Sequence, residues 1–257
     1  MTAPVSLSFS DDQTRTKITL FHEKGNIVTA EMVEALRTAL EGISDNPNVK
    51  LITLEGAGPD FSFGASIPEH TPGRIASVLP AMHALIEDLL DAPAVTAAIV
   101  RGRCLGGGFE LALACDFIFA ADDATFGLPE IELGVFPPAA AALLPLRVGA
   151  ARATRAIVTG ATSRAADWQA AGLVELIAPA DRLAAAVDDW FHTHMVSKSA
   201  AALRHATAAA RSDLHARVRE TLPALEQLYL NDLMRTHDAV EGIAAFMEKR
   251  APSWKHR

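Results

Sequence analysis

The first half of the chain alternates between short apolar segments and longer segments with apolar residues at helical spacing. Apolar and β-branched residues fill four segments of strand length, at 16–21, 49–56, 94–102 and 117–122. Two helical patterns lie between them, at 30–44 and at 75–93, and Thr29 is a candidate N-cap for the first. Strands that alternate with helices predict an α/β fold with a parallel or mixed sheet.

The strand pattern fades after about residue 150. One short segment of strand type remains, at 173–179. The remaining residues are helical in pattern, in the segments 181–196, 199–214 and 217–250. In the last segment, Pro223 or the turn residues at 238–242 are expected to divide two helices. A helical C-terminal third predicts either an oligomerisation region or a lid over the core, and the pattern favours neither.

Three consecutive glycines, Gly106 to Gly108, stand between the strand predicted at 94–102 and a helix that opens with Phe109. Glycines there let the backbone approach a ligand and leave N–H groups at a helix N-terminus free to bind an anion or an oxyanion. Their order matches neither GxGxxG nor GxxxxGK[ST], which disfavours a nucleotide-phosphate loop. A tight strand-to-helix turn explains the glycines equally well.

Glu110 and Glu130 stand among apolar residues and are candidates for general acid and base chemistry. Glu110 lies in the first turn of the helix after the glycines, where the helix dipole alone also favours a carboxylate. Glu130 follows a strand and a turn, again with apolar neighbours. Two carboxyls in an apolar cleft can hold one proton between them, because burial and mutual repulsion disfavour two charges.

A second turn of small residues, Gly64 to Ser66, follows the strand predicted at 49–56. Its backbone N–H groups can point at the same ligand as those of the three glycines. Two N–H groups aimed at one point form an oxyanion hole, which stabilises charge that develops on a carbonyl oxygen. Without the glycines, an ordinary turn before Pro68 would be the simpler interpretation.

The composition is that of an ordinary globular chain. Of 257 residues, 50% are hydrophobic and 21% are charged, which argues against disorder. The net charge of -8 disfavours a nucleic-acid partner, because neutralising phosphates needs a basic face. The two cysteines match neither a metal pair nor a disulfide scaffold, and we predict no metal site. No signal-peptide pattern and no apolar run of about 20 residues occurs, so we expect a cytoplasmic protein without membrane contact.

Three motifs together resemble the enoyl-CoA hydratase/isomerase family, also called the crotonase family. They are FGAS at 63–66, GRCLGGGFELALACD at 102–116 and FGLPEIELGVFP at 126–137. The resemblance extends over nearly the whole chain and implies a spiral of β-β-α units. It places a crotonase-like core with the acyl-CoA site in residues 1–195 and a helical trimerisation region in 196–257. Such trimers commonly stack in pairs, so we expect a homotrimer or a dimer of trimers.

The resemblance also implies roles for individual residues. The amides of Ala65 and Gly107 would hold the thioester oxygen, and Glu110 and Glu130 would be the catalytic acid and base. Glu132 matches no catalytic position. The partner is an acyl-CoA thioester, and no cofactor is needed, because coenzyme A is part of the substrate. Further CoA or substrate contacts are expected at Lys24, Gly64, Ser66, Ile67, Gly106, Gly108, Phe136, Pro137, Phe246 and Lys249, the last two commonly reaching a neighbouring subunit.

Two departures from typical enoyl-CoA hydratases bear on the substrate. The chain reads GASIPE at 64–69 where they read GADIKE, and FPPAAAALLP at 136–145 where they have a glycine-rich turn. Both departures most resemble the cyclohexa-1,5-diene-1-carbonyl-CoA hydratases of anaerobic aromatic degradation. A stiffer, more apolar wall would suit a flat ring. The alternatives are a generic short-chain enoyl-CoA hydratase, a non-catalytic binding protein of the same fold, and an isomerase or hydrolase.

Overall fold

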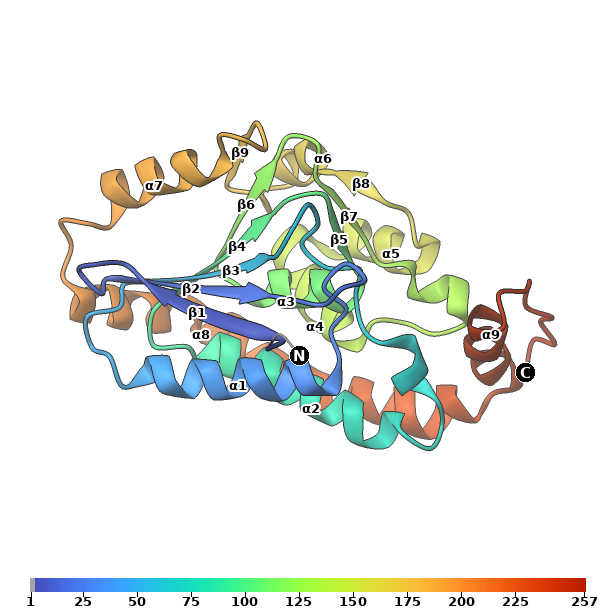
Figure 1. The fold of residues 1–257 in the computed structure, drawn as a ribbon. Helices are drawn as coiled ribbons and strands as arrows, with labels where there is room; N and C mark the ends of the chain where they lie inside the picture. Colours follow the sequence, from blue (N-terminus) through green and yellow to red (C-terminus); the bar gives the residue numbers. More distant parts are fainter. Residues whose placement is uncertain (1–2) are drawn as a thin grey trace.

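The computed structural model describes residues 3–257 and contains two β-sheets (Figure 1). The main sheet has the strand order β1(Val5–Phe9), β2(Arg15–Leu20), β3(Leu51–Gly56), β4(Val95–Val100), β6(Phe117–Ala121) and β9(Leu176–Ala178). The smaller sheet has the order β5(Arg103–Leu105), β7(Thr125–Gly127) and β8(Ser163–Arg164). This is the α/β fold with a crotonase-like spiral that the sequence predicted.

The main sheet is mixed. Strands β1 and β2 form an antiparallel hairpin, and every other neighbouring pair in the main sheet is parallel. The four strands predicted first all occur within two residues of the expected ends, as β2, β3, β4 and β6. All six residues of the central strand β4 are buried, because neighbouring elements cover both of its faces. Strands β5, β7 and β8 were not predicted, since two or three residues are too few to show a periodicity.

Helices cover the sheet on both sides. They are α1(Ala30–Ser44), α2(Ile75–Asp91), α3(Gly107–Ala114), α4(Pro138–Val148), α5(Ala150–Thr159), α6(Ala165–Ala170), α7(Leu183–His194), α8(Ala200–Gln227) and α9(His237–Met247). Helices α1, α2 and α8 lie beneath the main sheet in Figure 1, and α7 lies above it. The Thr29 hydroxyl accepts a hydrogen bond from the amide of Met32 at 3.2 Å, which confirms the predicted N-cap of α1. No helix within residues 3–257 is long and apolar enough to cross a membrane.

The C-terminal helices divide at a different place from the one predicted. Helix α8 continues through Pro223 to Gln227, and residues 238–242 lie inside α9. The break is a π-helical turn, Leu228–Asp232, followed by a short 3-10 turn at 233–235. Proline removes one helical hydrogen bond, but Val218 and Leu222 on the same stretch of α8 are buried in the core. Packing therefore holds the helix together where its local sequence favours an end.

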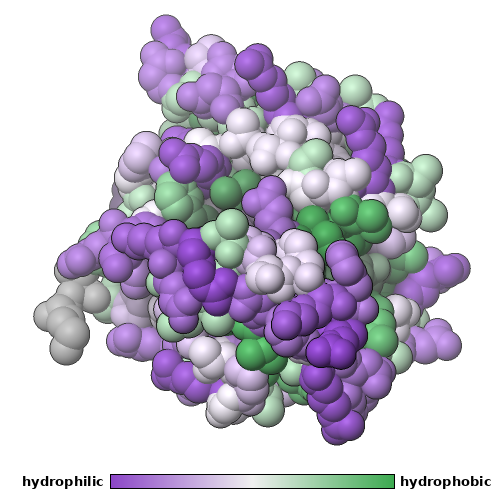
Figure 2. Space-filling model, turned by 90° about the vertical axis from the view of Figure 1, so that its right-hand side faces the viewer, coloured by the Kyte–Doolittle hydropathy of each residue, from purple (hydrophilic) through white to green (hydrophobic). Residues whose placement is uncertain are grey.

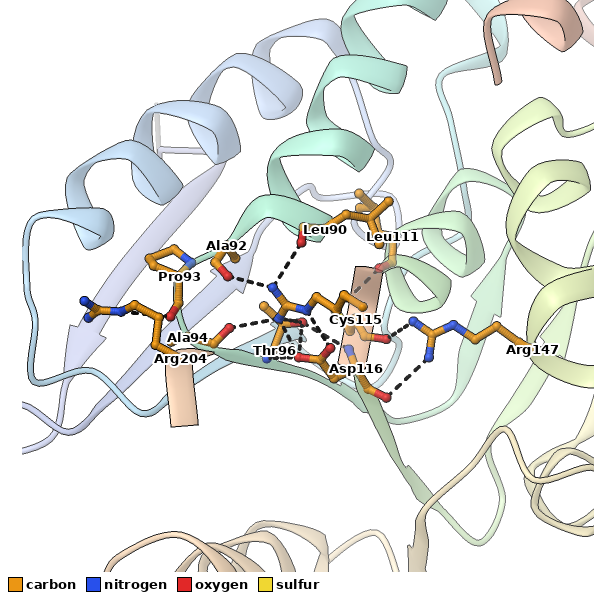
Figure 3. A network of polar contacts seen from close by, with 11 residues as sticks. Leu90, Ala92, Pro93, Ala94, Thr96, Leu111, Cys115, Asp116, Arg147 and Arg204 are labelled. Atoms are coloured by element: carbon orange, nitrogen blue, oxygen red, sulfur yellow. Dashed lines mark hydrogen bonds and ion pairs between the residues drawn. The ribbon is translucent and has the colours of Figure 1, made fainter. Parts of the chain in front are cut away.

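A buried arginine ties α8 to the sheet. The guanidinium of Arg211 forms a bidentate pair with Asp116, with N···O distances of 2.7 and 2.5 Å. It also donates to the carbonyl oxygens of Leu90, in the last turn of α2, and of Ala92 and Ala94, which lie between α2 and β4. Figure 3 shows these carbonyls, Thr96 and Asp116 converging on one point. Since Asp116 in turn accepts from the Thr96 amide at 2.8 Å, the network connects α8, β4 and the end of α3.

Replacing Arg211 with alanine should lower the free energy of unfolding by about 3 kcal/mol, because the partly buried Asp116 carboxylate and the three carbonyl oxygens would lose their common partner. The matched control is Arg217→Ala on the same helix, whose ion pair with Asp213 is exposed. That change should cost no more than about 0.5 kcal/mol. Urea unfolding followed by circular dichroism measures both values. Equal losses in the two variants would contradict a structural role for the Arg211 network.

Candidate active site

One cavity collects residues from every part of the chain that carried a predicted motif. Its polar part is formed by the turn at 64–65, the start of α3 and the short helix η2(Pro129–Leu133). Its apolar part comes from α2, from residues 135–138 and from the C-terminal region. The enclosed space is about 90 Å³. A mostly apolar cleft with a few convergent polar groups is typical of a small-molecule site.

Two backbone amides, those of Ala65 and Gly107, lie close together at this cavity. A methyl group placed on Gly107 would be 3.2 Å from the Ala65 nitrogen. An isolated β-bridge from Ser62 to Cys104 holds the segment of the first turn against that of the second, and a bridge from Val28 to Ala65 fixes the first turn on its other side. Within residues 3–257, neither amide donates a hydrogen bond to another group of the chain. Two free N–H groups at one place can bind and stabilise an oxygen that gains negative charge.

The glycines around these amides are required by close contacts. Gly64 has a φ of 99°, and a methyl group on it would lie 2.9 Å from the carbonyl oxygen of Leu105. Gly106 has a φ of 49°, and a methyl group on it would lie 2.7 Å from a carboxyl oxygen of Glu130. The backbone conformation disfavours a side chain at both positions, and at Gly64 the backbone oxygen of Leu105 also leaves no space for one. Gly108 does not line the cavity, because it packs against Ser62, where a methyl group would meet the side chain at 2.5 Å.

Glu110 reaches the cavity from the first turn of α3. Its side chain is almost fully buried, and one carboxyl oxygen accepts a hydrogen bond from the Ala140 amide at 2.9 Å. Burial raises the pKa of Glu110 to about 7, although hydrogen bonds from the Ala140 and Ala139 amides oppose the shift. Both amides belong to the start of α4, so the positive end of that helix faces the carboxyl group.

Glu130 lies on η2, directly after Pro129. Its Oε2 atom is buried and has no hydrogen-bond partner within residues 3–257. Burial raises the pKa of Glu130 to about 8, and the neighbouring charge of Glu110 contributes to the shift. The two carboxyls therefore titrate as a pair near neutral pH, and a state with one proton between them is available there.

The proline-rich segment builds the wall behind the carboxyls. Phe136, Pro137 and Pro138 line the cavity, and α4 begins at Pro138, a position that suits proline because its missing N–H would have no helical partner. Ala139 and Ala140 follow, fully buried, and present their amides to Glu110. The prolines thus start the helix that holds the carboxyl group, in addition to shaping the pocket.

Several predicted contacts lie outside the cavity of this single chain. Gly64, Ile67, Gly106, Phe136 and Pro137 line it, whereas Lys24, Ser66, Gly108, Phe246 and Lys249 do not. Phe246 is 56% exposed near the end of α9, and Lys249 follows it in an exposed turn. Figure 2, which shows the side of the molecule at the right of Figure 1, has apolar patches between polar side chains. Large apolar side chains exposed on α9 and the tail are Val240, Phe246, Met247 and Trp254.

Sequence reasoning missed most of the apolar lining. Leu79 and Met82 come from α2, Tyr229 comes from the π-helical turn and Ile243 comes from α9. No motif marks these residues, because they are far apart in the sequence and look like ordinary core positions. Tyr229 had one available signal, since it is the single tyrosine of the chain.

The comparisons with known proteins agree with this geometry. The sequence profile of the enoyl-CoA hydratase/isomerase family matches residues 12–257. The chain is 43% identical to the cyclohexa-1,5-dienecarbonyl-CoA hydratase of Thauera aromatica, over 99% of this chain and 98% of that protein. It is 35% identical to a probable enoyl-CoA hydratase of Mycobacterium bovis, over 90% of each chain.

A solved structure matches equally widely. The crystal structure of an enoyl-CoA hydratase from Mycobacterium avium subsp. paratuberculosis superposes with a TM-score of 0.86 at 28% identity, covering 98% of this chain and 99% of that one. The match includes both sheets and the C-terminal helices, so it extends over the whole cavity. The chain therefore belongs to the enoyl-CoA hydratase/isomerase family and acts as an enoyl-CoA hydratase, a hydro-lyase.

Proposed function

We propose that the chain adds water to cyclohexa-1,5-diene-1-carbonyl-CoA and forms 6-hydroxycyclohex-1-ene-1-carbonyl-CoA, a step of benzoyl-CoA degradation. The observation that carries the chemistry is the meeting of two buried carboxyls and two free amides in one apolar cavity. The ring substrate is supported by the 43% identity to a hydratase named for that substrate, against 35% for the probable enoyl-CoA hydratase of Mycobacterium bovis.

In the proposed mechanism the Ala65 and Gly107 amides hold the thioester oxygen. Attack of water on the β-carbon moves electrons toward this oxygen, and an enolate-like charge develops on it. The two N–H groups are already oriented and have no other acceptor within residues 3–257. Such preorganised donors are often the largest single contribution to catalysis.

We assign Glu110 as the base and Glu130 as the acid. Amides at the start of α4 stabilise the Glu110 carboxylate, whereas one carboxyl oxygen of Glu130 has no hydrogen-bond partner within residues 3–257, so the proton is held at Glu130. The ionised Glu110 takes a proton from water while the oxygen attacks the β-carbon. The protonated Glu130 then gives its proton to carbon. The net change is one water added and one carbon–carbon double bond lost, and at the end Glu110 is protonated and Glu130 is ionised.

A ring substrate separates the two reacting carbons. Attack at the β-carbon of the conjugated ring gives a dienolate, whose far end is the ring carbon opposite the new hydroxyl group. Protonation there leaves one double bond conjugated with the thioester. The flat wall of Phe136, Pro137 and Pro138 would hold the ring between these positions, because prolines keep the backbone rigid. Holding both reacting ends in place lowers the entropic part of the barrier.

The coenzyme A part would lie outside the cavity and use a neighbouring subunit. Phe246 and Lys249 are exposed and free to contact the nucleotide portion of a second chain's substrate. Residues 196–257 would then serve as the trimerisation region, in agreement with the apolar side chains exposed on α9. Such remote contacts help to position the reacting atoms.

Changing either glutamate to glutamine should lower kcat by at least about a hundredfold, because an amide neither accepts nor gives a proton in this pH range. Glu132→Gln is the matched control, since Glu132 stands on the same short helix but is exposed and lies outside the cavity. Steady-state hydration assays on folded variants measure the effect. A near-normal rate in Glu110→Gln or Glu130→Gln would contradict the two-carboxyl mechanism.

The pH profile of kcat/KM should be bell-shaped, with its limbs near pH 7 and pH 8. Below both pKa values the two carboxyls are protonated and no base remains, whereas above both the two are ionised and no acid remains. Hydration rates measured from pH 5.5 to about pH 9.5 span both limbs. A profile that stays flat across this range, or peaks below pH 5, would refute the assignment of the pair.

The ring preference is tested by comparing kcat/KM for cyclohexa-1,5-diene-1-carbonyl-CoA and for crotonyl-CoA. We expect the ring substrate to be favoured by at least about a hundredfold, on the scale that several additional pocket contacts supply. The variant Phe136→Ala, which shortens the wall, should reduce the ring rate more than the crotonyl-CoA rate. A preference for crotonyl-CoA would overturn the substrate and support a short-chain hydratase of the same mechanism.

A further inference from the structure

Tyr229 brings a hydroxyl group to the cavity, in addition to the two carboxyls and the two amides. It lies on the π-helical turn Leu228–Asp232 that interrupts the C-terminal helices, a kind of turn that is frequent at functional sites. Only 1% of the residue is exposed, and its ring packs edge-on against Phe136 with centroids 5.5 Å apart. Its hydroxyl group is buried and has no hydrogen-bond partner within residues 3–257.

A buried hydroxyl group without a partner destabilises the folded chain. A phenylalanine could make the same edge-on contact with Phe136 without this cost. The unpaired hydroxyl group therefore indicates a partner that binds in the cavity. Buried polar groups without a hydrogen-bond partner are rare in native structures, and those that occur commonly serve a function. Tyr229 is the single tyrosine in 257 residues, and the chain has 11 phenylalanines, so a plain aromatic ring was readily available.

The surroundings narrow the identity of that partner. Apolar side chains of Leu79 and Ile243 pack in the same cluster as Tyr229 and offer no acceptor or donor. The charges of Glu110 and Glu130 raise the pKa of Tyr229 further than burial alone, which places the hydroxyl within their electrostatic reach and keeps it neutral. The Oε2 atom of Glu130 is also unpartnered. Two orphan polar atoms in one cavity are typical of a site for a small polar ligand.

A dedicated contact fixes the turn that carries Tyr229. One helical turn earlier, Glu226 forms a 2.6 Å contact with His83 of α2, and this pair is largely buried. Helix α2 also supplies Leu79 and Met82 to the cavity. Figure 1 shows α2 and α8 running side by side beneath the sheet. The pair therefore sets the position of the tyrosine relative to the apolar lining.

We propose that the Tyr229 hydroxyl binds the oxygen that is added to the substrate, as the attacking water in one direction and as the new hydroxyl group in the other. An enoyl or dienoyl group has only one other polar atom, the thioester oxygen, and the Ala65 and Gly107 amides serve that atom. The added oxygen is thus the remaining group able to satisfy a hydroxyl deep in an apolar pocket. The proposal rests on the proposed hydration reaction, and it applies to a linear as well as to a cyclic acyl group.

The test compares a ligand that carries the hydroxyl group with a ligand that lacks it, in the full-length protein and in Tyr229→Phe. In the dehydration direction, kcat/KM for 6-hydroxycyclohex-1-ene-1-carbonyl-CoA should fall at least about tenfold in the variant, the scale of one lost hydrogen bond. The inhibition constant of cyclohexanecarbonyl-CoA, which lacks the hydroxyl group, should change less than about twofold, because its ring has no polar atom for the Tyr229 hydroxyl to bind. An unchanged kcat/KM, or an equal loss for both ligands, would overturn the proposal.

The same comparison with 3-hydroxybutyryl-CoA and butyryl-CoA separates this inference from the choice of substrate. The ring substrate would be refuted if only the linear hydroxylated ligand reacts. The role of Tyr229 would still hold if Tyr229→Phe then weakens the reaction of 3-hydroxybutyryl-CoA and leaves the binding of butyryl-CoA unchanged. If the wild-type protein turns over either hydroxylated ligand and the variant does so equally well, the role of Tyr229 fails and the hydration stands. Turnover of neither ligand by the wild-type protein would refute both.

Two further measurements distinguish binding from a structural role. The melting temperature of ligand-free Tyr229→Phe should equal or exceed that of the wild type, because the variant removes an unsatisfied buried group. In wild-type protein labelled at the tyrosine Cζ carbon, the single NMR signal should shift on saturation with the hydroxylated ligand and not with its unhydroxylated partner. A lower melting temperature together with unmoved kinetics would make Tyr229 a structural residue.

Discussion

The close approach of two backbone turns is the constraint on which the site depends. Gly64 and Ala65 pass so near to Gly106 and Gly107 that a methyl group on Gly64 would collide with the carbonyl oxygen of Leu105 at 2.9 Å. The approach is possible because β3 and β4 run parallel, so the segments that follow them leave the sheet at the same edge. Each turn keeps one amide without an acceptor within residues 3–257, and both residues line the cavity.

The buried carboxyl pair lowers the stability of the folded state, and the packed core must compensate for this. Burial raises the folded-state pKa of Glu110 and Glu130 above the ordinary glutamate value, so the folded protein binds their protons more tightly than the unfolded chain does. Their contribution to stability is therefore greatest below the ordinary pKa near 4.5 and falls as the pH rises through 7 and 8. Functional sites commonly carry such local costs, and here α4 offsets part of the cost with two amides at its N-terminus.

The sequence predicts those parts of the fold and of the site that depend on a few neighbouring residues. Long apolar strands, the helix capped by Thr29, and the glycine turns with their two glutamates can all be read directly, because each depends on a few neighbouring residues. The end of α8 cannot, since Pro223 signals a break that the buried Val218 and Leu222 override. The cavity lining is harder still. Leu79 and Ile243 become neighbours only when α2 and α9 pack together, and nothing in their local sequence distinguishes them from core residues.

The polar groups of the cavity and its apolar wall come from different parts of the chain, and this affects specificity. Amides and carboxyls come from the tightly packed core between residues 64 and 130, where glycine contacts leave no room for change. The wall comes from 135–138 and from the C-terminal turn, which touches the core through side chains. A change at Phe136 or Tyr229 can therefore alter which acyl group fits without moving the oxygen-binding amides. The contact between the Phe136 and Tyr229 rings joins the two halves of this wall, so the proline-rich segment and the π-helical turn together set the shape and polarity that the acyl group meets.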